Sequence, residues 1–454
     1  MRRSGNALLA AVLAGLPGLA LACALPPSIV MTLPIGHYLA GAAVTVALTA
    51  LMAGGAAWLR LPAPVTLARW PAGSGADWLS YFSFVIFLAL LFTGWVGPRD
   101  PMHNLLTLVF WAGVWVALPL LSLLTGDLWG ALNPWRGPVR MLRLLTGWQG
   151  SVGLTRLGAW PAVAGLAGFS WFQIISLAPE DPMILAQAAG LYWLVIFIAA
   201  CLEGEDWLKE GEFLHLTFAM IARLAPFRIS TAAGERALQL GWPGAHIVTA
   251  PSLRPSGQVF VLLLLAALSF DGLQATFFWL GLIGENPLEF TGRSAVQGIN
   301  TLGLIGSFAL TAALIYGAIA LGRRLSGAAL PAGPVMLSFL AIAAGYHAAH
   351  YLMMLLTAGQ YLLLALNDPL LQGDAFLGLE PFWVSMGFLT DRSVMTAIWN
   401  LQFALIVGVH VLAVMLALQM TPGRRSGLAH LPLSVLMVGY TIFGLWLLSS
   451  PTGV

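Results

Sequence analysis

Long apolar runs separated by short polar segments dominate the chain. Each holds roughly the 20 mostly apolar residues that a membrane-spanning helix needs. Backbone polar groups cannot remain unpaired in lipid, so such runs are expected to be helices. The pattern predicts an all-α fold, a polytopic transmembrane helix bundle with about ten spans. The runs are Leu33–Leu59, Trp78–Val96, Leu105–Leu124, Trp160–Ala178, Ile184–Cys201, Gln258–Leu280, Gly298–Leu321, Val335–Leu356, Val394–Met420 and Leu433–Leu448.

The first 24 residues have the pattern of a leader. Arg2 and Arg3 precede an apolar stretch that ends at Ala20-Leu21-Ala22, which resembles a signal-peptide cleavage site. Residues 1–24 are therefore expected to be a signal peptide or, if uncleaved, a first helix. In both cases the chain that follows starts outside the membrane.

The basic residues indicate an orientation. If Leu33 faces outside and every run crosses the membrane, only Arg99, Arg293 and Arg392 of the 20 basic residues fall on the outer side. Cytoplasmic connections of membrane proteins carry an excess of basic residues. The sequence therefore predicts a bacterial inner-membrane protein whose mature N- and C-termini both lie outside.

The composition excludes several classes of protein. Hydrophobic residues make up 59% of the chain and charged residues 8%, whereas a soluble globular protein has about 25% charged residues. The net charge of +2 gives no basis for nucleic-acid binding. Cys23 and Cys201 lie far apart and form no metal-binding motif. The sequence has no H-E-x-x-H, P-loop or G-x-S-x-G motif, which favours a protein that is not an enzyme.

The longest inner connection, residues 202–257, divides the runs into two halves, 33–201 and 258–448. Two five-helix halves of this kind are typical of inverted repeats in transporters. Within the connection, Leu214, Phe218 and Ile221 recur at helical spacing. This spacing predicts an amphipathic helix that lies on the inner face or, alternatively, binds a partner protein.

A second inner segment, residues 127–144, combines Trp and Leu residues with Arg136, Arg140 and Arg143. One interpretation is a basic interfacial helix that contacts anionic lipid headgroups. The other is a re-entrant turn that binds an anionic solute. The sequence leaves both open.

Asp271 is the single carboxylate residue inside a predicted span. Ionisable groups at membrane depth cost roughly 2.5 kcal/mol or more and usually have a function. Asp271 is therefore a candidate for proton or cation coupling. The alternative is a structural hydrogen bond to a neighbouring helix, with Gly272 allowing that helix to approach closely.

Besides His37, near the outer end of the first run, three histidines lie in the predicted spans. His347 and His350 share a helix face, and His410 is expected at a depth similar to that of His347 on the next span. His347 and His410 could ligate a haem b iron axially or bind a transition metal. The histidines could instead relay protons or join helices by hydrogen bonds.

The stretch Gly345-Tyr346-His347-Ala348-Ala349-His350-Tyr351, with Phe270-Asp271-Gly272 and Asn133-Pro134-Trp135-Arg136, resembles an uncharacterised family of bacterial polytopic inner-membrane proteins. The resemblance spans the third to the ninth run. It implies a protein of the bacterial envelope and no particular activity.

These features favour a secondary transporter or permease for a small solute or ion. Asp271, His347, His350 and His410 would then bind or couple a proton, cation or substrate. One alternative is a haem- or metal-binding redox protein that uses His347 and His410. A further alternative is a non-catalytic assembly subunit with a protein partner. The lipid bilayer is an expected partner in every case, and nucleic acid is not.

Overall fold

The computed structural model describes residues 35–53, 61–71, 77–232, 234–289, 292–380, 383–421 and 426–452. The expected leader, residues 1–24, and Cys23 lie outside these residues.

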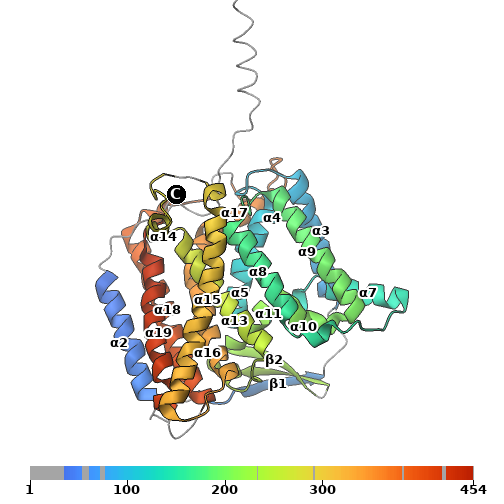
Figure 1. Cartoon of the computed structure of the whole chain (residues 1–454). Helices are drawn as coiled ribbons and strands as arrows, with labels where there is room; N and C mark the ends of the chain where they lie inside the picture. The colour runs from blue at the N-terminus through green and yellow to red at the C-terminus, as the bar shows by residue number, and fades with distance from the viewer. Residues whose placement is uncertain are drawn as a thin grey trace, which may run out of the picture.

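The described chain is a helix bundle with one small sheet, which confirms the all-α transmembrane fold (Figure 1). Within the described residues, eight helical stretches are long and apolar enough to cross a membrane. The chain is thus a multi-pass membrane protein. These stretches are α3 (Asp77–Val96), α4–η2–α5 (Leu105–Thr125), α9 (Pro182–Glu203), α13 (Pro255–Gln274), α15 (Arg293–Ser326), α16 (Ala332–His350), α18 (Arg392–Met420) and α19 (Ser426–Ser449).

Two other predicted spans correspond to apolar helices outside these eight: α2, described over Ile35–Ala53, and α8 (Trp160–Ile175), which ends before Ala178. Two others end early. The run Gln258–Leu280 stops at Gln274, because Thr276 caps a separate short helix, α14 (Phe277–Leu282), by accepting a hydrogen bond from the Trp279 amide. The run Val335–Leu356 breaks at Tyr351, where α16 ends and α17 (Leu352–Asn367) begins.

The third predicted span is one continuous helix with an irregular centre. It runs through α4 (Leu105–Leu108), the π-helical stretch η2 (Val109–Ala117) and α5 (Leu118–Thr125). Pro119 offers a physical reason for the irregularity. It has no N–H to donate to the Trp115 carbonyl, which an α-helix would require. Wider π-helical turns commonly occur at such points and often mark functional sites.

The helices of the two predicted halves are interleaved in space. α2, from the first half, packs against α18 and α19, and the Tyr38 ring lies 5.1 Å from the Phe403 ring. α17, from the second half, packs against α4 and η2. Figure 1 shows α2 beside α18 and α19 at one side of the bundle, and α17 beside α4.

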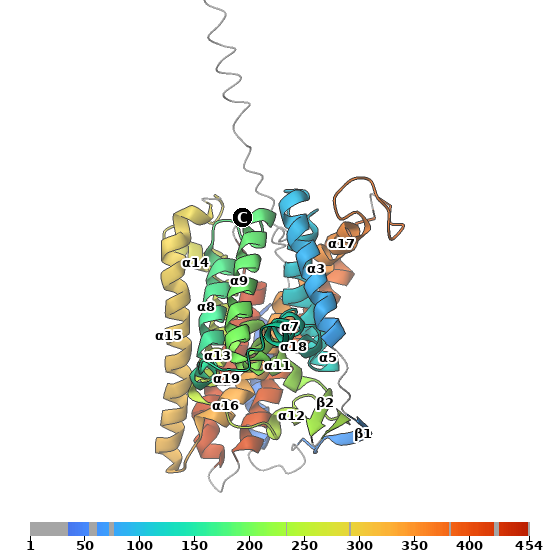
Figure 2. The same cartoon turned by 90° about the vertical axis from the view of Figure 1, so that its right-hand side faces the viewer.

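The small sheet lies at the lower end of the bundle in Figures 1 and 2, and short helices of the predicted inner connections lie above it; we call this region the basic end. It holds a three-stranded antiparallel sheet in the order β1-β3-β2. The elements in this region are β1 (Val65–Pro71), α6 (Trp129–Leu132), α7 (Arg136–Thr146), η3 (Leu154–Leu157), η4 (Glu205–Trp207), α10 (Leu208–Gly211), α11 (Phe213–Ile221), η5 (Ala222–Leu224), β2 (Phe227–Ala232), β3 (Glu235–Leu240) and α12 (Ala245–Val248).

The helix expected on the inner face, α11, is instead buried inside the protein. Phe218 is fully buried, and the Phe213 ring stacks on Phe169 of α8 at 5.1 Å. α11 is apolar on more than one face, and it packs against α5, α8 and α16. A helix with apolar residues around its circumference is stable when surrounded by other helices, which explains the difference from the expected surface position.

Candidate functional site

Three of the four predicted intramembrane residues lie close together where α13 and α16 end. Asp271 lies in the last turn of α13, and His350 is the last residue of α16. The Asp271 carboxylate oxygen Oδ2 accepts a hydrogen bond of 2.6 Å from the Tyr351 hydroxyl and lies 3.2 Å from His350 Nε2. The Asp271 side chain is 15% exposed and that of His350 is 24% exposed. The carboxylate is thus held by two side chains from the break between α16 and α17.

A third helix completes this group. Gln173 of α8 donates a hydrogen bond from Nε2 to the Tyr351 hydroxyl at 2.5 Å. The Tyr351 hydroxyl therefore accepts a hydrogen bond from Gln173 and donates its single proton to the hydrogen bond with Asp271. We call Asp271, His350, Tyr351 and Gln173 the Asp271 cluster.

The guanidinium group of an arginine lies at the C-terminal end of α8, the helix that carries Gln173. Arg293, the first residue of α15, donates from Nη1 to the backbone carbonyls of Gln173 and Ser176, each at 3.1 Å. Carbonyls at a helix C-terminus carry a partial negative charge, so a guanidinium group there is favourable. Arg293 thus fastens the start of α15 to the helix end beside the cluster.

Gly272 lets α16 approach α13 closely, as the sequence suggested. A methyl group at Gly272 would overlap the Tyr346 hydroxyl. The Tyr346 ring stacks on the His350 ring, with centroids 5.4 Å apart. The close approach of the two helices therefore helps to fix the His350 ring beside Asp271.

His347 lies next to the cluster and joins it to the π-helical stretch. Its Nε2 donates a hydrogen bond of 2.9 Å to the Trp115 carbonyl, the one that Pro119 deprives of its α-helical donor. The His347 ring also lies 4.7 Å from the Tyr351 ring. His347 thus supplies a hydrogen-bond donor to the Trp115 carbonyl, which cannot receive one from Pro119.

His410 lies apart from the other three predicted residues. Its Nδ1 donates to the Ile406 carbonyl of its own helix at 2.7 Å, and its buried Nε2 has no hydrogen-bond partner among the described residues. In the described structure, no hydrogen bond or ring contact joins His410 to His347. The structure therefore gathers Asp271, His347 and His350 but not His410.

The space beside the cluster is small. A cavity lined by Trp115, Gln173, Asp271 and Tyr351, among others, has room for about one water molecule. In this conformation the site suits a proton, a water molecule or a small cation rather than an organic solute.

His347 does not fit the haem alternative. Its Nε2, the nitrogen that would bind iron, donates to the Trp115 carbonyl, whereas His410 donates through Nδ1 to the Ile406 carbonyl and keeps its Nε2 without a partner among the described residues. The described residues also contain no group of three or more His, Cys, Asp or Glu side chains able to hold a metal ion. A shared axial pair would require the His347–Trp115 bond to break.

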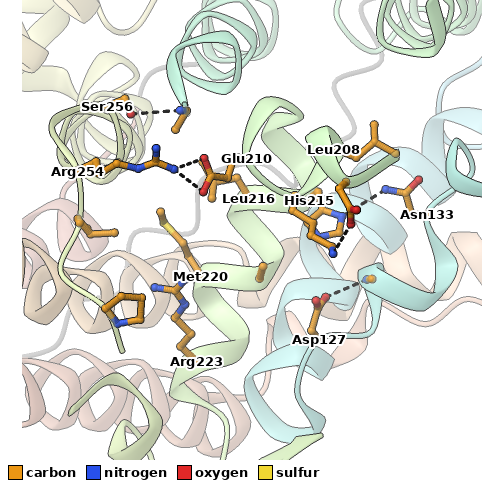
Figure 3. A pocket seen from close by; sticks show the side chains of 18 of the residues that line it. Asp127, Asn133, Leu208, Glu210, His215, Leu216, Met220, Arg223, Arg254 and Ser256 are labelled. Atoms are coloured by element: carbon orange, nitrogen blue, oxygen red, sulfur yellow. Dashed lines mark hydrogen bonds and ion pairs between the residues drawn. The ribbon is translucent and has the colours of Figure 1, made fainter. Parts of the chain in front are cut away.

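A second candidate site lies at the basic end, and part of it comes from residues 127–144, for which the sequence left the binding of an anionic solute open. A pocket of about 650 Å³ forms between residues 127–136, 205–223 and 251–257 (Figure 3). His215 and Asn133 bond to each other on one side, and Arg254 pairs with Glu210 on the other. Residues 127–144 and residues 202–257, which the sequence analysis considered separately, both line the pocket. They do so because α6 and α11 pack together.

Glu212 is a buried carboxylate that the sequence analysis missed. It caps α11 by accepting hydrogen bonds from the amides of Leu214 at 2.8 Å and His215 at 2.6 Å, and it also accepts from the Tyr192 hydroxyl. Burial raises the pKa of the Glu212 carboxyl above its usual value. The sequence could have indicated this role, because Glu212 directly precedes the apolar run Phe213–Ile221. Side chains that accept hydrogen bonds commonly cap a helix from the position just before its first residue.

Comparison with known proteins supplies no relative: no family model matches the chain, and no curated protein or solved structure matches it.

Proposed function

We propose that the chain is a secondary transporter or permease that couples the movement of a small solute or ion to a proton or cation at the Asp271 cluster. The observation that carries the proposal is a carboxylate at membrane depth whose oxygen contacts an imidazole and a phenol. Imidazole and carboxylate groups can both gain and lose protons. Intramembrane carboxylates with such partners are typical of proton relays.

The break between α16 and α17 supports the same proposal. Discontinuous helices commonly form the coupling sites of transporters, because they bring backbone groups and side chains to one point inside the membrane. Here the break at Tyr351 directs its hydroxyl to Asp271. In the proposed cycle, protonation of Asp271 weakens its attraction to His350 and allows α17 to move relative to α16.

We further propose the bacterial inner membrane as the location, with the basic end in the cytoplasm. The distribution of Arg and Lys residues supports this orientation through the positive-inside rule. The mature N- and C-termini would then both lie on the periplasmic side.

The test uses purified protein in liposomes that contain a trapped pH-sensitive dye. A panel of amino acids, sugars, organic acids and monovalent cations is added outside, and proton movement is recorded. We expect at least one compound to drive proton movement with the wild-type chain and not with Asp271→Asn. The matched control is Asp374→Asn, the same chemical change at an exposed residue, which should behave like the wild type.

Two results would count against the proposal. One is compound-driven proton movement that persists in Asp271→Asn. The other is a wild-type protein that responds to no compound in the panel. Elution volume and thermal midpoint of each variant in detergent establish that it is folded before its transport is compared.

A further inference from the structure

Most charges around the pocket at the basic end have partners within the protein. Arg254 pairs with Glu210, and Lys209 lies 2.6 Å from Asp206. Glu205, which also lines the pocket, pairs with Arg140. These pairs neutralise each other and leave the wall close to electrically balanced.

Arg223 differs from the other cations of the pocket. Its Nη1 atom is buried, and it has no hydrogen-bond partner within the described residues. A guanidinium group stays charged in proteins. A buried charge without a partner is strongly unfavourable, so such groups are normally paired. Arg223 therefore lacks the counter-charge that its environment requires.

The surroundings of Arg223 add positive rather than negative charge. Burial and the neighbouring charge of Arg228 on β2 both lower the pKa of Arg223. In the part of the chain that the structure describes, Arg228 makes no ion pair of its own. Figure 3 shows Asp127 at the opposite side of the pocket from Arg223. A partly buried guanidinium that lines a pocket, with a second one nearby, is a favourable place for an anion.

We propose that this pocket binds a ligand with a phosphate or carboxylate group, and that Arg223 is the anion-binding residue. The planar fork of a guanidinium matches two oxygens of either group. The volume of about 650 Å³ suits a small organic molecule. Met220, Leu216 and Leu253 also line the pocket and provide an apolar wall for the rest of the ligand.

Two sources could supply such a group, a soluble phosphorylated or carboxylated molecule and the headgroup of an anionic phospholipid. The basic end lies where the α7 segment exposes Met141, Leu144 and Leu145, so lipid can reach this region. The ligand site does not depend on the proposed transport activity, because binding is measured without a gradient.

The experiment measures thermal unfolding of the purified full-length chain in detergent as inorganic phosphate replaces chloride at constant ionic strength. We expect a saturable rise in the midpoint for the wild type and no rise for Arg223→Met. Without phosphate, Arg223→Met should melt at a higher temperature than the wild type, because it removes an unpaired buried charge. If Arg223 only stabilised the fold, Arg223→Met would instead melt at a lower temperature than the wild type. Arg324→Gln, at an exposed position, is the matched control and should keep the phosphate response.

A second arm distinguishes the sources. The wild type and Arg223→Met are compared in lipid nanodiscs of phosphatidylcholine alone and with phosphatidylglycerol added. If a lipid headgroup occupies the site, phosphatidylglycerol stabilises only the wild type and abolishes its response to phosphate. If the ligand is soluble, the response to phosphate is the same in both lipids.

The proposal is overturned if phosphate stabilises the wild type and Arg223→Met equally, or if neither phosphate nor phosphatidylglycerol affects the wild type. Arg223→Lys keeps the charge without the planar fork. It should retain a thermal response to phosphate with a weaker apparent affinity. If Arg223→Met fails to fold, an affinity of Arg223→Lys equal to that of the wild type overturns the proposal.

Discussion

Tyr351 connects three helices through a single hydroxyl group. It donates to Asp271 of α13 and accepts from Gln173 of α8, while its backbone lies between α16 and α17. This hydroxyl makes the shorter of the two side-chain contacts to Asp271 Oδ2, 2.6 Å against 3.2 Å for His350 Nε2. At the scale of single residues, Tyr351 is therefore the residue whose loss should disturb the cluster most directly.

We predict that Tyr351→Phe lowers the free energy of unfolding by about 1–3 kcal/mol, the usual cost of leaving a buried polar group without its partner. Thermal unfolding in detergent measures the change. Tyr361→Phe is the control, because the Tyr361 hydroxyl makes no hydrogen bond in the described structure, while its ring packs against the hydrophobic core and His103 and is kept in Phe. Equal midpoints for the two variants would contradict the role of Tyr351.

The sequence identified part of the cluster and missed the rest for a physical reason. Asp271 and His350, and His347 beside the cluster, are conspicuous because they are ionisable residues in apolar runs. Tyr351 and Gln173 are neutral residues, and their contact joins positions far apart in the chain. The depth of His410 can be estimated from its run, but the rotation of its helix depends on packing against other helices, which spacing does not reveal.

At the scale of helices, close packing depends on small residues placed at particular points. α15 and α19 are in contact where Gly322 faces the carbonyl of Ala429. A methyl group at Gly322 would overlap that carbonyl, which belongs to the backbone and cannot rotate away. Gly317, on the same helix, has no other atoms within 4 Å of the position that a methyl group would take.

We predict that Gly322→Ala destabilises the protein by about 1–3 kcal/mol, the usual cost of overpacking a tight contact. Gly317→Ala should have no such cost and should gain up to about 1 kcal/mol from the higher helix propensity of Ala. Chemical unfolding of both variants in mixed micelles compares them. Similar losses of unfolding free energy in the two variants would show that the α15–α19 contact does not cause the destabilisation of Gly322→Ala.

Helix boundaries were predicted well where a polar residue or a cap marks the end, and less well inside continuous apolar sequence. The span Trp78–Val96 matches α3 to within one residue. The break at Tyr351 was missed, because the apolar sequence continues through it without Pro or Gly. Tertiary bonds from the Tyr351 side chain accompany the break, and these are invisible in the local pattern.

At the scale of the whole molecule, the response to acid should include a contribution from buried histidines. Burial lowers the pKa of His246 below its usual value near 6.5. The unfolded chain therefore takes up a proton at this residue more readily than the folded protein does. The contribution of His246 to stability is complete above about pH 6.5 and is lost progressively as the pH falls toward its folded pKa.

We predict that the thermal midpoint of His246→Gln falls less than that of the wild type between about pH 7.5 and pH 5.5. One group contributes at most about 1.4 kcal/mol for each pH unit in this window. His37→Gln, at an exposed position, is the control and should keep the wild-type pH dependence. Identical pH profiles for the wild type and His246→Gln would contradict the prediction.

The transmembrane class followed from the sequence, whereas the arrangement of helices did not. Hydrophobicity determines which segments enter lipid, and it is readable along the chain. Which helices become neighbours depends on side-chain shape, as in the contact of Tyr38 with Phe403. The interleaving of the two halves therefore appeared only in the structure.

That interleaving has a consequence for biosynthesis. α2 emerges from the ribosome before almost all of the rest of the described chain, yet its packing partners, α18 and α19, are translated last. Until then one side of α2 must be covered by lipid or by the insertion machinery. Its native contacts form only after translation is nearly complete, so the earliest of the described helices is among the last to take its final place.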